Sequence, residues 1–147
     1  VDASEIKNSG ANQVNNFLDI LPQMDAVSIH CPKNEETTNM FSENEFKIMK
    51  ESAFLINCAR GGIVNEVALL DALKSNEIRA AGLDVYDDEP STSSNPLFSL
   101  DNILLSPHIA GVTQEATIRM SKQAVQNVLD VFDDKVDPEV IINKNVL

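Results

Sequence analysis

Short apolar runs alternate with helix-like segments along the 147-residue chain. Four of the runs have the length and composition of β-strands, and they cover residues 25–30, 53–58, 79–85 and 102–106. Pro32 closes the first run and Pro107 the last, because proline cannot continue a hydrogen-bonded strand. The segment 92–98 is rich in Ser, Asn and Pro and is expected to be irregular. The runs lack polar alternation, so we expect both faces of the strands to be buried.

Helical periodicity appears between these runs and after the last one. It predicts helices over residues 42–49, 65–75 and 113–134, the first two beginning at the capping residues Ser42 and Asn65. The apolar positions of the third segment form one continuous face, made of Met120, Ala124, Val125, Val128, Leu129 and Phe132. This helix is therefore expected to pack along one side.

Strands that alternate with helices at this spacing predict the α/β class, with part of a doubly wound, Rossmann-like parallel sheet. In such sheets, ligands bind beyond the carboxyl ends of the strands. Four groups of residues directly follow the apolar runs, namely Cys31 and the segments 58–62, 84–89 and 107–111. We expect these groups to converge on one cleft.

The composition is that of a folded domain, with 43% hydrophobic and 23% charged residues. The formal net charge of −12 repels phosphate and anionic lipid, so we expect neither nucleic acid nor a membrane as a partner. No apolar run approaches the roughly 20 residues that a membrane span needs. Cys31 and Cys58 are interpreted as reduced, buried, small apolar residues, and we expect no metal site. Reduced cysteines favour a cytoplasmic location.

Arg60 is the first candidate for chemistry. It follows a predicted strand and precedes Gly61 and Gly62, which allow a ligand to approach the backbone closely. The planar guanidinium suits a carboxylate, because it offers paired N–H donors. The alternative is an arginine on the surface of a loop.

The acidic segment 84–89 and His108 are the other candidates. Four carboxylates in six positions are usual in a solvated loop, but Asp84 ends a strand and could accept a hydrogen bond from a ligand amide. Glu89, fixed before Pro90, could orient a histidine. His108 stands at the predicted ligand edge, where it could exchange protons with a ligand, although a packed core histidine is the alternative. His30 is interpreted as structural or as a backbone-level neighbour of a cofactor.

Three motifs, over residues 57–66, 82–90 and 107–111, closely resemble those of D-isomer-specific 2-hydroxyacid dehydrogenases. This group includes phosphoglycerate, glycerate and D-lactate dehydrogenases, and the resemblance extends from about residue 17 to residue 147. It implies that Arg60 binds the carboxylate and C2 oxygen of a small 2-hydroxy or 2-oxo acid. His108 would accept the hydroxyl proton while C2 gives hydride to NAD, and Glu89 would hold His108 and stabilise its charged form.

The resemblance also implies a set of contacts with the NAD cofactor. Asp84 would lie near the nicotinamide ring, and Asp2 would bind the ribose hydroxyls and favour NAD over NADP. The other expected contacts are Cys31, Pro32, Cys58, Ala59, His108, Ala110 and Gly111. The sequence lacks the Gly-x-Gly-x-x-Gly loop that binds pyrophosphate, which this family carries upstream of the region seen here. Asn65 replaces the Asp that the family often has, and both residues cap helices well.

The same resemblance suggests how the chain is divided and which functions compete. Residues 1–112 would form the C-terminal part of an NAD-binding domain, and residues 113–147 a helix and tail belonging to the substrate domain. We expect the full-length enzyme to be a homodimer and this chain alone to be inactive. The alternative is an NAD(H)-sensing corepressor-like module without catalysis. A formate dehydrogenase relative is disfavoured, because Glu89 stands where that branch is expected to have Gln.

Overall fold

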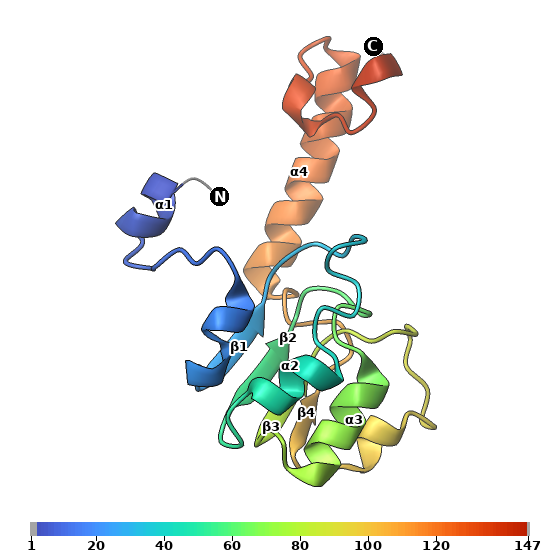
Figure 1. The fold of residues 1–147 in the computed structure, drawn as a ribbon. Helices are drawn as coiled ribbons and strands as arrows, with labels where there is room; N and C mark the ends of the chain where they lie inside the picture. Colours follow the sequence, from blue (N-terminus) through green and yellow to red (C-terminus); the bar gives the residue numbers. More distant parts are fainter. Residues whose placement is uncertain (1–2, 147) are drawn as a thin grey trace. The chain divides into compact units, whose positions relative to one another are not determined.

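The computed structural model describes residues 3–146 of the chain. It contains two compact units, one that ends at His108 and one that begins at Ile109 (Figure 1). Asp2, one of the expected cofactor contacts, lies outside the described residues.

The first unit is built on a four-stranded parallel sheet in the order β1-β2-β3-β4. The strands are β1 (Ala26–Ile29), β2 (Phe54–Asn57), β3 (Ala80–Leu83) and β4 (Ile103–Leu105). All four lie within the apolar runs, so the predicted strands and the α/β class are confirmed. Ile29 is in register with Asn57, Asn57 with Leu83, and Leu83 with Leu105. The segments that follow the strands therefore leave the sheet at one edge.

Two capped helices connect the first three strands. α2 (Glu43–Ile48) begins after Ser42, whose backbone N–H donates to Glu45 Oε2 at 2.9 Å. α3 (Glu66–Ser75) begins after Asn65, whose side-chain oxygen accepts from the backbone N–H of Ala68 at 2.9 Å. Both predicted helices and both predicted capping residues are confirmed.

The chain before β1 and after β3 contains shorter elements. α1 (Ala3–Asn8), η1 (Phe17–Asp19) and η2 (Leu21–Gln23) precede β1. η3 (Pro96–Ser99) leads to β4 and occupies the end of the segment expected to be irregular. That expectation is wrong at its end, because the Asn95 side chain accepts from Leu97 N–H and Pro96 suits the first helical position.

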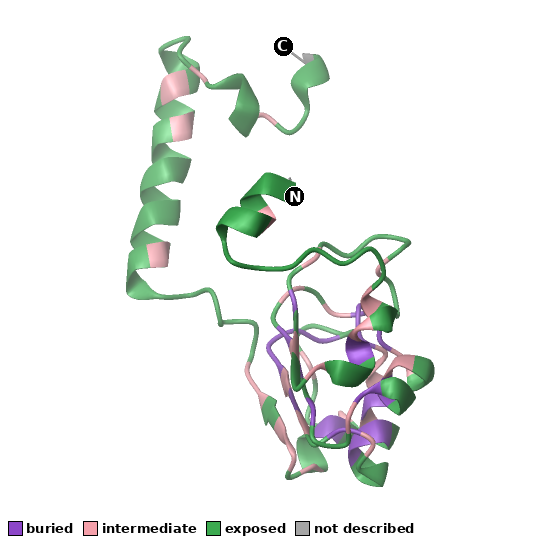
Figure 2. Ribbon diagram, turned by 60° about the vertical axis from the view of Figure 1, so that its left-hand side comes forward, coloured by how far each residue is buried: buried purple, intermediate pink, exposed green. Residues whose placement is uncertain are grey.

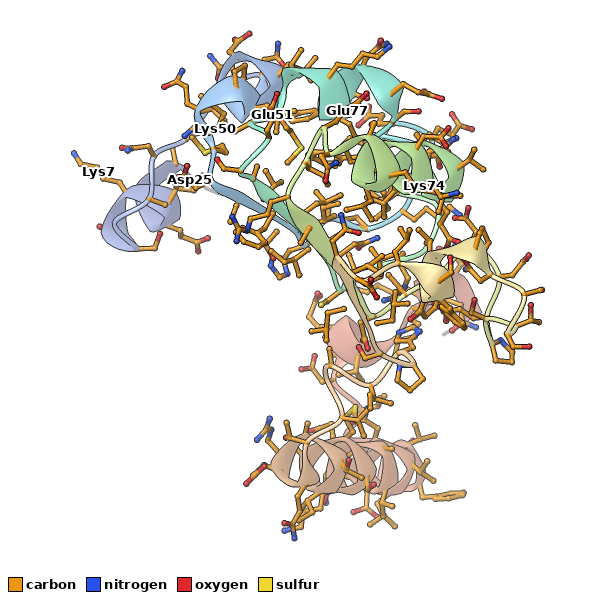
Figure 3. The ribbon with its side chains drawn as sticks, turned by 90° about the horizontal axis from the view of Figure 1, so that it is seen from below. Lys7, Asp25, Lys50, Glu51, Lys74 and Glu77 are labelled. Carbon is orange, nitrogen blue, oxygen red and sulfur yellow. The ribbon has the colours of Figure 1, made fainter. Side chains whose placement is uncertain are left out.

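Both helices cover one face of the sheet, where the apolar core lies (Figure 1). This follows from the topology, because right-handed crossovers between strands added in one direction all fall on one side. The core there includes Leu55, Ile63, Leu69, Leu73 and Ile78. At its margin Lys50 Nζ donates to Asp25 Oδ1 at 2.8 Å, and Figure 3 labels both residues.

The opposite face of the sheet is open. Phe54 is 42% exposed and Leu104 is 78% exposed, whereas Leu55 is fully buried. The expectation that both faces are buried is therefore wrong for the described residues. The physical reason is that all the crossovers of these four strands lie on the other side, so the chain contains only one helical layer of a doubly wound sheet.

The second unit consists of one long helix and a short tail. α4 (Gln114–Phe132) begins after Thr113, whose hydroxyl accepts from Ala116 N–H, so the predicted helix is confirmed. η4 (Pro138–Val140) and η5 (Lys144–Val146) follow. Most of α4 is exposed, as Figure 2 shows, and the exposed residues include the apolar side chains of Met120, Val125, Val128, Leu129 and Phe132. Among residues 3–146, no helix combines the length and the apolar character that crossing a membrane requires.

Candidate active site

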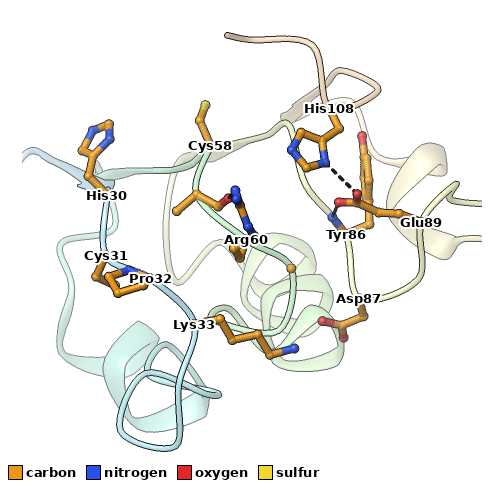
Figure 4. A pocket seen from close by; sticks show the side chains of 12 residues that line it. His30, Cys31, Pro32, Lys33, Cys58, Arg60, Tyr86, Asp87, Glu89 and His108 are labelled. Atoms are coloured by element: carbon orange, nitrogen blue, oxygen red, sulfur yellow. Dashed lines mark hydrogen bonds and ion pairs between the residues drawn. The ribbon is translucent and has the colours of Figure 1, made fainter. Parts of the chain in front are cut away.

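A cavity of about 790 Å³ lies where the strands of the first unit end (Figure 4). The residues that line it are His30, Cys31, Pro32, Lys33, Cys58, Ala59, Arg60, Gly61, Tyr86, Asp87, Glu89 and His108. They come from the segments that follow β1, β2, β3 and β4. The strand register explains this convergence, because it aligns the ends of all four strands.

Glu89 and His108 form a close pair at this cavity. His108 Nδ1 lies 2.7 Å from Glu89 Oε2, and the backbone N–H of Tyr86 donates to Glu89 Oε1 at 2.9 Å. The hydrogen bond from His108 and then that from Tyr86 lower the pKa of Glu89. Glu89 is therefore an ionised acceptor at neutral pH, with both oxygens engaged.

The backbone at His108 is unusual. Its φ of 55° lies in the left-handed region, which a residue with a side chain seldom adopts. The preceding residue, Pro107, ends the β4 segment and restricts the chain there. With Nδ1 held by Glu89, Nε2 is the ring nitrogen that remains for a ligand in the cavity.

Buried Asn57 shapes the turn that carries Arg60. The Asn57 side chain is 1% exposed, accepts from Ala59 N–H at 3.0 Å and donates to the Arg60 carbonyl at 3.0 Å. The Arg60 guanidinium donates to the Ala59 carbonyl at 2.6 Å. Within the described part of the chain it has no carboxylate partner at ion-pair distance. Its remaining N–H donors are available to a ligand.

Gly61 is required by close contact between two strand exits. A methyl group at this position would lie 1.7 Å from the Tyr86 carbonyl oxygen. The turn after β2 therefore packs directly on the backbone after β3, which brings Arg60 and Glu89 to the same cavity. Only glycine permits this approach without displacing backbone atoms.

The structure places some of the expected site residues at the cavity and others outside it. Arg60, Glu89, His108, Cys31, Pro32, Cys58 and Ala59 line the cavity. Asp84 is 3% exposed and accepts from Ser106 Oγ at 2.6 Å, so it lies below the cavity surface and is not among its lining residues. Ala110 and Gly111 belong to the second unit.

The expected burial of both cysteines is wrong. Cys58 is exposed and Cys31 is half-buried, and both thiols are free. The apolar runs that precede them end within the sheet, while the cysteines themselves lie in the exits that line the cavity. Among the described residues no group of histidine, cysteine and carboxylate side chains could hold a metal ion.

Lys33, Tyr86 and Asp87 also line the cavity. Tyr86 and Asp87 lie in the segment 84–89, which was expected to reach the cleft, but neither was assigned a role, and Lys33 was not expected there. The available signal was their position, since Lys33 directly follows Pro32 and the other two lie between Asp84 and Glu89. A strand exit predicts where the chain turns, but it does not specify which of its side chains face a ligand.

Comparison with known proteins places the chain in a family. Residues 1–110 match the family model described as "D-isomer specific 2-hydroxyacid dehydrogenase, NAD binding domain". The chain belongs to this family. The resemblance seen in the three sequence motifs is thereby confirmed, and residues 1–110 constitute an NAD-binding domain region of the family.

Relatives of known function and known structure support this assignment. The chain is 37% identical over 143 residues to a glyoxylate reductase of Aeropyrum pernix, covering 97% of this chain and 42% of the relative. It is 37% identical over 115 residues to a D-3-phosphoglycerate dehydrogenase of Archaeoglobus fulgidus, covering 78% of this chain and 22% of the relative. The chain thus spans less than half the length of these relatives.

A solved structure of an NAD-complexed D-isomer specific 2-hydroxyacid dehydrogenase from Lactobacillus delbrueckii ssp. bulgaricus has the same fold. It superposes with a TM-score of 0.76 at 33% identity, covering 88% of this chain and 43% of that one. The cavity is compatible with a nicotinamide cofactor, because residues from the strand exits surround an open space beside His108.

Proposed function

We propose that this chain contributes the Arg60, Glu89 and His108 side of an active site that interconverts a D-2-hydroxy acid and its 2-oxo acid with NAD. The observation that supports it is the 2.7 Å contact between His108 and ionised Glu89 on the same cavity as Arg60. The three side chains are distant in sequence, and each provides a function that the reaction requires.

Arg60 binds the substrate carboxylate through its free N–H donors, and the family resemblance implies that it also contacts the C2 oxygen. His108 Nε2 accepts the proton of the C2 hydroxyl during oxidation and returns it during reduction. Glu89 stabilises the imidazolium that forms, because its carboxylate is fixed at Nδ1 and stays charged.

The bound nicotinamide cofactor supplies the hydride chemistry. We infer that Cys31, Pro32, Cys58 and Ala59 contact it, mainly through the backbone. Asp84, Ala110, Gly111 and Asp2 complete the proposed cofactor set on the strength of the family resemblance. The net charge of −12 disfavours anions over the molecule as a whole, so the cations Arg60 and Lys33 at this cavity attract the anionic acid locally.

We further propose that residues 113–147 belong to the substrate domain of the whole protein, which is a cytoplasmic homodimer. The exposed apolar face of α4 supports an assignment in which that helix packs against another part of the assembly. Two free cysteines are consistent with a reducing compartment.

Assays of the full-length protein on a panel of 2-oxo acids with NADH test this function. We expect turnover of at least one 2-oxo acid, and a loss of roughly 10²- to 10⁴-fold in kcat for His108→Gln. His30→Gln is the matched control, because His30 lines the same cavity but bonds to Ser28 Oγ at 2.8 Å rather than to a carboxylate. Tight NADH binding without turnover of any 2-oxo acid would instead indicate a sensor.

A further inference from the structure

Tyr86 is buried beside the catalytic pair, although it contributes no group to the proposed chemistry. It is the single tyrosine of the chain and is 7% exposed. Its backbone N–H donates to Glu89 Oε1 at 2.9 Å. Figure 4 shows its ring next to Glu89 and His108. One end of this residue therefore fixes the carboxylate of the pair.

The other end of Tyr86 reaches the segment that carries His108. The phenolic hydroxyl donates to the backbone carbonyl of Ser106 at 3.0 Å. Ser106 is separated from His108 only by Pro107, whose ring restricts the backbone. Anchoring the Ser106 carbonyl thus restricts the backbone position of His108, and with it the position of the imidazole.

Ser106 has a second bond to the same strand exit. Its hydroxyl donates to Asp84 Oδ1 at 2.6 Å, and Asp84 is 3% exposed. The segment after β4 is therefore tied to the segment after β3 by two hydrogen bonds. The Tyr86 hydroxyl donates to the Ser106 carbonyl, and the Ser106 hydroxyl donates to the Asp84 carboxylate. The ring of Phe98 packs edge-on against Tyr86 with centroids 6.0 Å apart, which holds the phenol in place.

We propose that Tyr86, with Ser106, is a positioning residue that holds His108 against Glu89. This inference rests on the proposed function, because it concerns the same proton-transfer pair. Neither residue needs to touch the substrate in this role. The left-handed φ of 55° at His108 makes such anchoring necessary, because a residue in that region of the backbone is maintained by its surroundings.

The hydroxyl of Tyr86 remains a donor over the working pH range. Burial, followed by the nearby carboxylates Asp84 and Glu66, raises the pKa of Tyr86 above its ordinary value of 10.0. The phenol is thus protonated at neutral pH, and its hydrogen bond to Ser106 persists wherever the enzyme is assayed.

Tyr86→Phe in the full-length protein tests the inference, because it removes one hydroxyl and keeps the ring and the backbone N–H. We expect kcat to fall by about 5- to 30-fold, while KM for the 2-oxo acid and for NADH changes by less than about 2-fold. A looser His108 also bonds less to Glu89, so the pKa of Glu89 moves back up. In 2-oxo acid reduction His108 must carry a proton, so the acid limb of the pH profile of kcat follows the protonation of Glu89 and should shift to higher pH.

Ser99→Ala is the matched control. This substitution also removes a hydroxyl that donates to a backbone carbonyl, in this case that of Pro96 at 2.7 Å. Ser99 lies on η3 and, among the described residues, forms no hydrogen bond with the segments that carry Glu89 and His108. We expect its kcat and pH profile to match the wild type. Proton NMR of the His108 Nδ1–H resonance gives a second measurement, which should broaden in Tyr86→Phe through faster exchange with water.

The outcomes separate this inference from the proposed function. If His108→Gln abolishes turnover and Tyr86→Phe changes neither kcat nor the acid limb, the positioning role is wrong while the function stands. If His108→Gln retains full turnover, the proposed function itself fails. A lower thermal midpoint of Tyr86→Phe with an unmoved acid limb would show that Tyr86 serves packing only.

Discussion

At the scale of single residues, the cavity depends on how closely two strand exits approach. A methyl group on Gly61 would lie 1.7 Å from the Tyr86 carbonyl oxygen and 2.9 Å from the Asp87 nitrogen. Both are backbone atoms that belong to a segment held by hydrogen bonds to Glu66 and Glu89. They cannot move without opening the turn that orients Glu89.

We therefore predict that Gly61→Ala lowers the free energy of unfolding by about 3 kcal/mol, at the upper end of typical overpacking costs. Urea denaturation followed by circular dichroism measures it. Gly111→Ala is the control, since a methyl group there meets none of the described atoms within 4 Å, and it should change stability by less than about 0.5 kcal/mol. Equal stability of the two variants would refute the contact.

The pair itself predicts a dependence on pH. The pKa of Glu89 is lowered from its ordinary value of 4.5 by the hydrogen bonds from His108 and Tyr86. A group with a depressed pKa in the folded state contributes stability above its unfolded pKa and loses it as the pH falls through the folded pKa. The Glu89 carboxylate thus contributes at neutral pH and ceases to contribute in acid.

Glu89→Gln tests this sign, because it keeps the shape and removes the charge. We expect the wild type to be the more stable protein at pH 7, and the difference to shrink as the pH falls below 4.5. Urea titrations at a series of pH values from 7 to about 3 provide the measurement. A difference that stays constant over that range would show that Glu89 is not held as a carboxylate.

Sequence reasoning identified Arg60, Glu89 and His108, because each follows an apolar run and each matches a motif. It did not identify Tyr86 or Ser106, whose contribution is made by a backbone N–H, a carbonyl and two hydroxyls. The two hydroxyl contacts join residues 20 and 22 positions apart, and local sequence patterns do not contain them. The prediction that Cys58 is buried was wrong for a related reason, because an apolar run does not show on which side of the strand exit its last side chain lies.

At the scale of secondary-structure elements, α3 is the helix whose sequence signals are clearest. Asn65 caps it, and Ala68, Leu69, Ala72 and Leu73 provide the buried face that packs on the sheet. The cap satisfies a backbone N–H that would otherwise lack a partner at the helix start. Since this face forms part of the main core, a weaker cap should reduce the stability of the whole first unit.

We predict that Asn65→Ala lowers the free energy of unfolding by about 1 kcal/mol, whereas Asn65→Asp leaves it within about 0.5 kcal/mol. The aspartate carboxylate can accept the same bond from Ala68 N–H and adds a favourable charge at the helix N-terminus. Thermal and urea denaturation of the wild type, Asn65→Ala and Asn65→Asp measure these differences in stability. A loss in Asn65→Asp as large as that in Asn65→Ala would exclude capping as the role of this residue.

Strand prediction was correct in number and position but not in burial. Apolar runs without alternation are typical of strands with two buried faces, and β2 has such a run with Leu55 buried and Phe54 42% exposed. The sequence pattern is that of a strand whose two faces are both buried in the whole protein. The described residues provide helices on one side only, because their crossovers all have the same hand.

At the scale of the whole molecule, the open side of the sheet is the main unsatisfied surface of the first unit. Apolar residues from all four strands line it, including Ala26, Phe54, Ala80 and Leu104. Exposed apolar patches of this kind on a parallel sheet normally pack against further helices. Because the chain spans 42% of the length of a curated relative, the rest of the protein is the natural cover.

Leu104→Lys distinguishes a covered face from a solvated one. Leu104 is 78% exposed in this chain, so a lysine there should leave the stability of the isolated chain within about 0.5 kcal/mol and reduce its binding of an apolar dye. In the full-length protein, the same lysine would place a charge against packed apolar groups and should cost at least about 2 kcal/mol. Val67→Lys, at a 70% exposed position on α3, serves as a control for the change from an apolar to a charged side chain.

The two protein lengths make the result decisive. If Leu104→Lys costs little in both, the face is open to solvent in the whole protein, and a second layer of helices does not cover it. If it is costly in the full-length protein alone, the missing half of the doubly wound fold lies on this face. The cavity with Arg60 and His108 then sits at the edge of a sheet that is covered on both sides, which restricts water to the ligand end of the strands.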